Sequence, residues 1–358
     1  MILERTEQDS GVKVLFSLAC LVVIVFGLRY AAPILLPAAL ALFLAILSLP
    51  TMVVLRRRGV PKALSVIVPV LLNVAVVVLL ILVASSSFSQ LQSALPTYQQ
   101  TLQNLIFAWM EAFEASTDIV LSDYVTTNLT DILNPAAIIG FAGGAVGRVA
   151  QLLGMTFLVF LIMAFMLSEA MVFPEKFRFL TRGTEIQEDR LTKVVGEVQT
   201  YLGIKTVISL ATGLILGVWV WALGLDFPVL LGLAAFLLNY VPTVGSIIAA
   251  IPAVLLSIIL YGTVGHALVV TLGYVTVNTV FGNIIEPNLM GRRLGLSTLV
   301  VILSLLFWGW AWGPMGALLS VPLTVIVKIF LENTNDLRWV AILLDNAPPP
   351  AAVDGAAD

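Results

Sequence analysis

The chain has 358 residues, of which 60% are hydrophobic and only 11% are charged. Soluble domains are near half apolar and about a quarter charged, so this composition excludes an ordinary soluble protein and indicates a polytopic membrane protein. The net charge of −3 gives no sign of nucleic-acid binding, and the single cysteine, Cys20, excludes a disulfide within the chain.

The first predicted region, 1–84, contains a short polar tail and three apolar segments, at about 14–28, 33–55 and 63–84. The second and third are close to the length of about 20 residues that a membrane-spanning helix needs. The first is short, but Lys13 and Arg29 at its ends can extend to the two membrane surfaces. The densest basic cluster of the chain, RRRGVPK at 56–62, follows the second segment. The positive-inside rule places that loop, and with it the N-terminus, in the cytoplasm.

The second predicted region, 85–147, has five acidic residues and no Lys or Arg. Nothing in it resists translocation, so we expect it outside the cell. Large apolar residues recur in it at intervals of three and four, which predicts a mostly helical region; they are Tyr98, Leu102, Leu105, Trp109 and Phe113. A fourth span is expected in the next region, 148–173.

Residues 174–205 hold six of the 18 basic residues, so we expect this region in the cytoplasm. Its apolar residues share one helical face: Ile186, Leu191, Val194, Val195, Val198 and Leu202. That face could pack on the body of the protein, on a neighbouring subunit or on the lipid surface, and the pattern does not distinguish among these partners.

The region 206–331 contains two apolar runs with proline and glycine in the same order. The first includes LLNYVPTVGSIIAAIP (237–252) and the second WGWAWGPMGALLSVP (308–322). Proline removes a backbone donor and clashes with the preceding turn, so breaks are expected around these residues: Pro242, Gly245, Pro252, Gly313, Pro314, Gly316 and Pro322. The shared order indicates a weak internal repeat, read as two re-entrant hairpins at about 227–260 and 294–331. The alternative is that the prolines only kink helices that span fully.

The predicted fold is therefore an all-α polytopic membrane protein with about six full spans and two broken or re-entrant hairpins, about eight apolar segments in all. A small external helical region is added, and 332–358 is expected to be a cytoplasmic tail with a disordered end. Broken backbone at membrane depth must face protein or a wet cavity. Paired broken helices in repeated units point to the substrate site of a transporter.

Glu286 is the candidate coupling residue, because a desolvated carboxylate at the end of an apolar helix is costly to keep charged and suits proton transfer. Pro287 and Gly291 are expected to break the helix after it, and Arg292 and Arg293 to anchor the loop in the cytoplasm. The alternative is a structural ion pair between Glu286 and one of these arginines.

Polar residues near the breaks are the candidates for binding a small polar solute: Asn239, Thr243, Ser246, Asn278 and Asn283. The alternative role for the asparagines is hydrogen bonding between helices. The indoles at Trp308, Trp310 and Trp312 could stack on a ligand, but an interfacial aromatic belt is the preferred interpretation.

The elements LLNYVPTVGSIIAAIP, EPNLMGRR (286–293) and LFWGWAWGPMGALLSVPL (306–323) together resemble the autoinducer-2 exporter family, also called the permease M-like family. The resemblance covers nearly the whole chain to residue 331 and is strongest over 231–322. Its motif residues match here at Asn239, Pro242 and Gly245, at Glu286, Pro287 and Gly291, and at Trp308, Gly313, Pro314 and Gly316.

The resemblance implies an inner-membrane secondary transporter that exports a small polar solute such as autoinducer-2, driven by an ion gradient, or alternatively a sodium(lithium)/proton antiporter. It also implies a homo-oligomer such as a pentamer. The positive-inside rule places both termini in the cytoplasm. No GxxxxGK[ST] loop for nucleotide phosphates occurs in the sequence, and no cofactor or metal site is expected.

Two other classes of function are compatible with a membrane protein of this composition. A passive channel or scaffold is the second alternative to a coupled transporter. An intramembrane hydrolase using Ser246 and His266 is disfavoured, because the sequence has neither a GxSxG element nor HExxH. The chain is therefore not expected to be an enzyme.

Overall fold

The computed structural model describes residues 2–117, 155–172, 185–242, 244–290, 296–332, 334 and 337–345. Within these ranges most residues are helical and no β-strand occurs, which confirms the predicted all-α fold. Six helices of the described part are long and apolar enough to cross a membrane. They lie at Ala32–Arg57, Lys62–Ala115, Val195–Ala222, Val244–Tyr261, Val264–Leu289 and Thr298–Glu332.

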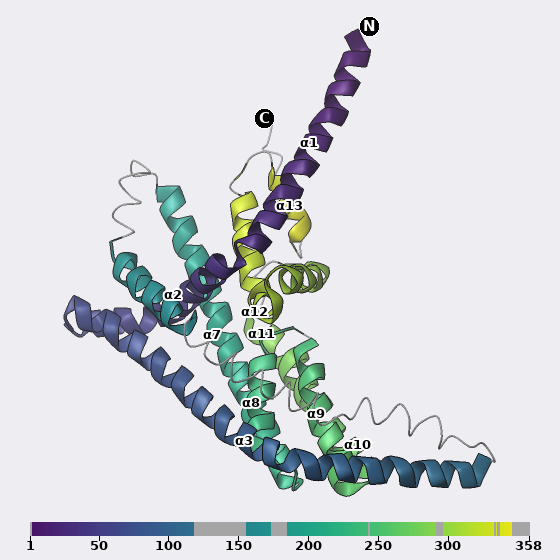
Figure 1. Cartoon of the computed structure of the whole chain (residues 1–358). Coiled ribbons are helices and arrows are strands. Elements are labelled where there is room, and N and C mark those ends of the chain that lie inside the picture. Colours follow the sequence, from purple (N-terminus) through teal and green to yellow (C-terminus); the bar gives the residue numbers. More distant parts are fainter. Residues whose placement is uncertain are drawn as a thin grey trace, which may run out of the picture.

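The N-terminal helices α1 (Ile2–Tyr30) and α2 (Ala32–Arg57) are joined by a tight turn. Figure 1 shows α1 extending away from the other helices. α2 packs against α3 and the helix Met155–Ala170 through a buried cluster that includes Ala41 and Met163. Within it Asn73 donates a hydrogen bond of 2.9 Å to Ser48 Oγ, which satisfies polar groups that lipid could not.

Helix α3 (Lys62–Thr117) is continuous over 56 residues, so it joins the predicted third span to the predicted external helix. At 1.5 Å per residue it is about 84 Å long, and a bilayer core of about 30 Å cannot contain it. Its far part contacts the turn after α7, where Tyr98 donates a hydrogen bond to Asp226 and packs edge-on against Phe227. Residues 118–147 of the predicted external region lie outside the described residues.

Helix α7 (Glu185–Ala222) is the central element of the described structure, and it joins the predicted cytoplasmic segment to the predicted fifth span without a break. Figure 1 shows it lying beside the later helices. Its buried positions recur at intervals of three and four, the spacing of one helical face: Val198, Tyr201, Leu202, Lys205, Ile208, Ser209, Thr212, Leu216 and Val220.

The first broken segment is a hairpin. Its arms are α8 (Pro228–Leu238) and α9 (Val244–Tyr261), separated by residues that include a non-helical stretch at 239–242. Tyr261, at the end of α9, donates hydrogen bonds to the carbonyls of Leu223 and Gly224, just before α8 begins. Because the segment returns to the place where it started, it has the geometry of a re-entrant hairpin; we call it hairpin 1.

Hairpin 1 fits closely against α7 because small residues meet at the contact. A Cβ on Gly232 of α8 would lie 2.7 Å from the carbonyl oxygen of Gly213 on α7, and a Cβ on Gly213 would lie 2.7 Å from that of Gly232. Small residues allow this backbone approach in membrane helices.

The second broken segment is also a hairpin. It lies within α12 (Thr298–Glu332), whose two arms meet at Gly313, where φ is 69° and ψ is −155°. Ser297, before the first arm, donates its N–H to the carbonyl of Leu344, and Lys328 in the second arm binds Asp345 at 2.7 Å. Both arms therefore end beside α13 (Arg338–Leu344); we call residues 298–332 hairpin 2.

The two hairpins lie toward opposite ends of α7 (Figure 1). Hairpin 2 shares a buried cluster with the earlier part of α7, at Val198, Tyr201 and Leu202. Hairpin 1 shares another with the later part, at Leu216 and Val220. The middle of α7, around residue 205, thus lies between them.

Three of the prolines predicted at the breaks do not interrupt a helix. α9 continues through Pro252, α12 continues through Pro322, and α11 (Glu286–Met290) continues through Pro287. The breaks lie instead at 239–242 and at Gly313. Three residues after each break, a glycine lies too close to a carbonyl for any Cβ: one built on Gly245 would lie 1.8 Å from Leu238 O, and one on Gly316 2.1 Å from Trp308 O.

Candidate functional site

A buried ion pair lies at the middle of α7. Lys205 Nζ is 2.7 Å from Oε1 and 2.9 Å from Oε2 of Glu286, so one ammonium binds both carboxylate oxygens. The side chains are only 4% and 17% exposed, respectively. Isolated charges are very costly in a dry environment, so each charge requires the other.

Glu286 begins α11, directly after a π-helical stretch, η1 (Thr279–Ile285), that continues α10 (Val264–Asn278). A π-helix has hydrogen bonds between residues five apart rather than four; it is rare, and it frequently occurs at functional sites. It widens the turn and changes the direction in which the following side chains point. An irregularity thus lies before Glu286, where none was predicted. The helix continues through Pro287, and the break predicted at Gly291 lies outside the described residues.

The tip of hairpin 1 covers this part of α7 through two hydrogen bonds. Tyr240 donates from its hydroxyl to Thr206 Oγ1 at 2.8 Å, and Asn239 donates from Nδ2 to Ser209 Oγ at 3.0 Å. Thr206 and Ser209 lie one and four residues after Lys205, so the tip is held beside the ion pair. Asn239 is 8% exposed and Ser209 is fully buried.

Tyr201 completes the buried polar group. It lies one helical turn before Lys205, is 6% exposed, and is close enough to both Glu286 and Tyr240 to interact with them electrostatically. Charge, hydroxyl and amide groups from α7, α11 and hairpin 1 therefore meet at one place. We call this group, Tyr201, Lys205, Thr206, Ser209, Asn239, Tyr240 and Glu286, the central polar site.

The structure brings together only part of the predicted set. Glu286 and Asn239 belong to the central polar site. Asn278 precedes η1 and is partly buried, Asn283 within η1 is exposed, and Ser246 is partly buried in the first turn of α9. Thr243, Gly291, Arg292 and Arg293 lie outside the described residues, as does the alternative pairing of Glu286 with either arginine.

Sequence reasoning missed Lys205, which it assigned to the end of a cytoplasmic segment. A signal was present, because Val198 and Leu202 had been placed on one apolar helical face, and steps of three and seven along that face lead to Lys205. A lysine on the buried face of an apolar helix requires an anionic partner. Tyr240 and Ser209 carried no comparable signal.

The three tryptophans hold hairpin 2 in place. Trp308 is buried and donates from Nε1 to Thr324 Oγ1 on the other arm at 3.1 Å, and Trp312 donates to the carbonyl of Leu28 on α1 at 3.0 Å. The guanidinium carbon of Arg29 lies over the ring of Trp310, 4.4 Å from the ring centroid. Neither Trp308 nor Trp312 is a free interfacial residue, since each donates its indole N–H within the protein.

The histidine of the disfavoured hydrolase interpretation lies at the base of hairpin 1. His266 Nδ1 is 3.1 Å from the hydroxyl of Ser257, and its ring stacks on Tyr261 at 3.8 Å between centroids. Tyr261 also donates a hydrogen bond to the carbonyl of Leu223 in the turn after α7. The contacts of Ser257, Tyr261 and His266 therefore stabilise the base of the hairpin.

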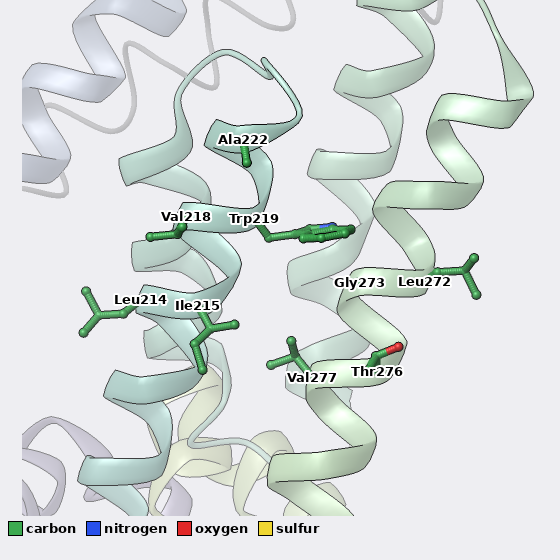
Figure 2. Close-up of a pocket in the computed structure, with 9 residues that line it drawn as sticks. All are labelled: Leu214, Ile215, Val218, Trp219, Ala222, Leu272, Gly273, Thr276 and Val277. Atoms are coloured by element: carbon green, nitrogen blue, oxygen red, sulfur yellow. The ribbon is translucent and has the colours of Figure 1, made fainter.

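A separate pocket of about 570 Å³ lies between α7 and α10. Figure 2 shows the ring of Trp219 reaching from α7 toward Gly273 of α10, with the aliphatic side chains of Leu214, Ile215 and Val277 below it. No charged residue lines this pocket. It suits an apolar chain, and a polar solute would find few partners there.

The sequence is similar to known transport proteins over nearly its whole length. The model of the family described as "AI-2E family transporter" matches residues 18–336. The "AI-2 transport protein TqsA" of Escherichia coli (strain K12) is 38% identical over 337 residues, covering 94% of this chain and 96% of that protein.

Two further relatives carry more general names. The "Putative transport protein YhhT" of Escherichia coli (strain K12) is 35% identical and covers 99% of this chain and all of its own length. A "Putative transport protein" of Haemophilus influenzae (strain ATCC 51907 / DSM 11121 / KW20 / Rd) is 34% identical over 93% of this chain and 96% of that protein.

Proposed function

Because the chain belongs to the AI-2E transporter family, we propose that it is a secondary transporter that exports a small polar solute such as autoinducer-2, coupled to an ion gradient. The chain is an integral membrane protein of the transporter class. The solute, the coupling and the direction are the proposal. One relative named as an AI-2 transport protein supports the choice of solute.

The observation that carries the coupling is the buried pair of Lys205 and Glu286 beside the tip of hairpin 1. A buried charge is retained where it is paired and hydrogen-bonded, and intramembrane ionisable residues are functional candidates by default. One proton transferred to Glu286 removes its negative charge and with it the attraction that holds Lys205.

The arrangement of the hairpins supports a transport cycle. They approach the centre of α7 from opposite ends, and transporters with repeated broken helices place their substrate site between such units. In our proposal, loss of the ion pair releases the hydrogen bonds of Tyr240 and Asn239 to α7. Hairpin 1 then moves relative to hairpin 2 and opens the central polar site to one side.

The same ion pair also favours a second candidate function, the sodium(lithium)/proton antiporter. A sodium ion could replace the ammonium at the two oxygens of Glu286, because carboxylate oxygens are hard ligands that suit such cations. The displaced ammonium of Lys205, left in a dry environment, would lose a proton. One cation would thus be exchanged for one proton.

Flux in proteoliposomes tests these functions. We expect purified protein to transport autoinducer-2 and an imposed pH gradient to change the rate, because Glu286 must gain and lose a proton in each cycle. Glu286→Gln should reduce the effect of the pH gradient on the transport rate by about tenfold or more, since an amide cannot carry the proton. Glu111→Gln, at an exposed acid of α3, is the matched control and should behave as wild type.

Each contrary outcome has a distinct meaning. Absence of autoinducer-2 flux would exclude it as the solute, and sodium-dependent proton movement in its place would establish the antiporter. Gradient-dependent autoinducer-2 flux that persists in Glu286→Gln would refute the role of Glu286. Leak of an unrelated polyol such as sorbitol at a similar rate would indicate the passive channel.

We further propose that the protein lies in the bacterial inner membrane as a homo-oligomer with both termini in the cytoplasm. The basic residues Arg56, Arg57 and Arg58 at the end of α2 support this orientation through the positive-inside rule.

A further inference from the structure

We propose that Lys205 is a binding site for a small monoanion, formed when Glu286 takes up a proton, so that the proton and the anion are carried together. This inference rests on the proposed function and specifies the charge of its solute. It starts from the geometry of the pair, in which both oxygens of Glu286 lie within 2.9 Å of the ammonium.

The first step is the charge of the site. Lys205 is 3% exposed, and its side chain hydrogen-bonds to Glu286 alone among the described residues. With both groups charged the site is neutral. One proton added to Glu286 gives the site a charge of +1, and leaving such a buried charge uncompensated is strongly unfavourable.

The second step is the nature of the surroundings. The polar groups of the central polar site on α7 and at the hairpin tip are the hydroxyls of Tyr201, Thr206, Ser209 and Tyr240 and the amide of Asn239. Tyr240 donates to Thr206, Thr206 donates to Leu202 O, and Asn239 donates one amide hydrogen to Ser209. The hydroxyl of Ser209 and the second amide hydrogen of Asn239 can donate to an anion, and Tyr240 can do so once the hairpin tip is released. Apart from Glu286, none of them is a carboxylate that could neutralise the ammonium.

The third step is linkage. If the anion binds more tightly when Glu286 is protonated, the proton also binds more tightly when the anion is present, by the same factor. Proton and monoanion then enter and leave as a neutral pair, and Lys205 keeps its charge throughout. Export would carry one proton out with each solute, with the solute made inside the cell supplying the gradient.

A neutral polyol cannot supply the missing charge, whereas a polyol that carries one negative charge can. The polyol groups would bind the hydroxyls and Asn239, and the charged group would take the position of Glu286 on Lys205. The site therefore selects the anionic form of a small hydroxylated solute over its neutral form.

The test uses Glu286→Gln, which imitates the protonated acid, with acetate and chloride as probe anions. We expect sodium acetate at ten times its Kd to raise the Tm of the purified variant by about 3 °C more than it raises the Tm of Lys205→Gln/Glu286→Gln at the same ionic strength. The double variant Lys205→Gln/Glu286→Gln is the matched control and should show no such rise. An equal rise in both variants, or none in either, would overturn the anion site.

The wild-type protein provides a second measurement should Glu286→Gln fold poorly. In weakly buffered solution near pH 5, adding sodium chloride should cause uptake of up to one proton per chain, and the double variant should take up none. Equal uptake by both proteins would overturn the inference.

Failure of this inference can be told from failure of the proposed function. Autoinducer-2 flux without an anion effect on the variants would leave the exporter in place and remove the anion site. An anion effect that depends on Lys205, without autoinducer-2 flux, would retain the site and exclude the solute.

Discussion

At the scale of single residues, the energetics of the central polar site depend on one contact between two charges that water cannot reach freely. Lys205 Nζ lies 2.7 Å from Oε1 of Glu286, and the two residues are 81 positions apart in the sequence. Such a pair adds little stability compared with apolar residues of the same shape, but removing one partner is costly. The pair therefore defines which charge state of the site is stable.

This asymmetry predicts the effect of mutation. Lys205→Gln should lower the free energy of unfolding by roughly 3–5 kcal/mol, because it leaves the carboxylate of Glu286 without its cation. The double variant Lys205→Gln/Glu286→Gln should recover most of that loss. Thermal unfolding of the purified protein, followed by tryptophan fluorescence, measures both.

The double-mutant comparison also reports on the pair itself. If the loss of stability in the double variant, measured against the wild type, equals the sum of the losses in Lys205→Gln and Glu286→Gln, the two side chains do not interact and the ion pair is refuted. A control at Lys328 is instructive, because that lysine binds Asp345 and Glu332 at the base of hairpin 2. Lys328→Gln should destabilise the protein without responding to the charge of Glu286.

At the scale of elements, the turn of hairpin 2 depends on the backbone of Gly313. Its φ of 69° and ψ of −155° fall in a region that is essentially restricted to glycine. Gly313→Ala should therefore destabilise the protein by about 1–3 kcal/mol, with loss of the hydrogen bond from Trp308 to Thr324 as the arms separate.

Gly309, four residues earlier on the helical first arm, is the matched control. A Cβ there would lie 3.6 Å from Ala317 Cβ, an ordinary contact, and alanine favours a helix over glycine by about 1 kcal/mol. Gly309→Ala should be neutral or slightly stabilising in the same thermal measurement. Equal losses in the two variants would contradict the conformational role of Gly313, because a Cβ there would meet no atom within 4 Å.

The sequence predicted the two breaks because proline and glycine act locally, through their own dihedral angles and hydrogen bonds. It could not determine which of them would end a helix, and α9 and α12 continue through Pro252 and Pro322. The π-helical stretch before Glu286 was also not predicted, since TVFGNII has no residue that demands it.

Partners distant in sequence were harder still to predict. Glu286 stood out because it is a lone carboxylate between apolar runs, but Lys205 became its partner only through the packing of α10, η1 and α11 on α7. α3 and α7 also continue across the predicted region boundaries. Helices propagate from residue to residue, and composition alone does not indicate where they end.

At the scale of the whole molecule, the two hairpins lie toward opposite ends of α7 (Figure 1). The base of hairpin 1 includes the turn after α7 and the end of α9, and it contacts the far part of α3 through Tyr98 and Asp226. The base of hairpin 2 lies beside α13. If each hairpin re-enters, these two bases face opposite sides of the membrane.

Cysteine labelling tests this arrangement. Cys20→Ser gives a background without cysteine, because Cys20 is the only one in the chain. In that background we expect Thr263→Cys, exposed between α9 and α10, to react with an impermeant thiol reagent added to intact cells, and Leu337→Cys, exposed beside α13, to react only after lysis. The positive-inside rule predicts that Arg293→Cys, like Leu337→Cys, reacts only after lysis.

The outcomes separate the two topologies. If hairpin 1 spans the membrane fully, position 293 moves to the outer side, and labelling of Arg293→Cys in intact cells would refute re-entry. Labelling of Thr263→Cys and Leu337→Cys from the same side would contradict the opposed hairpins themselves. In that case the central polar site would open to one side only, and a cycle that exposes Lys205 and Glu286 alternately to both sides could not operate.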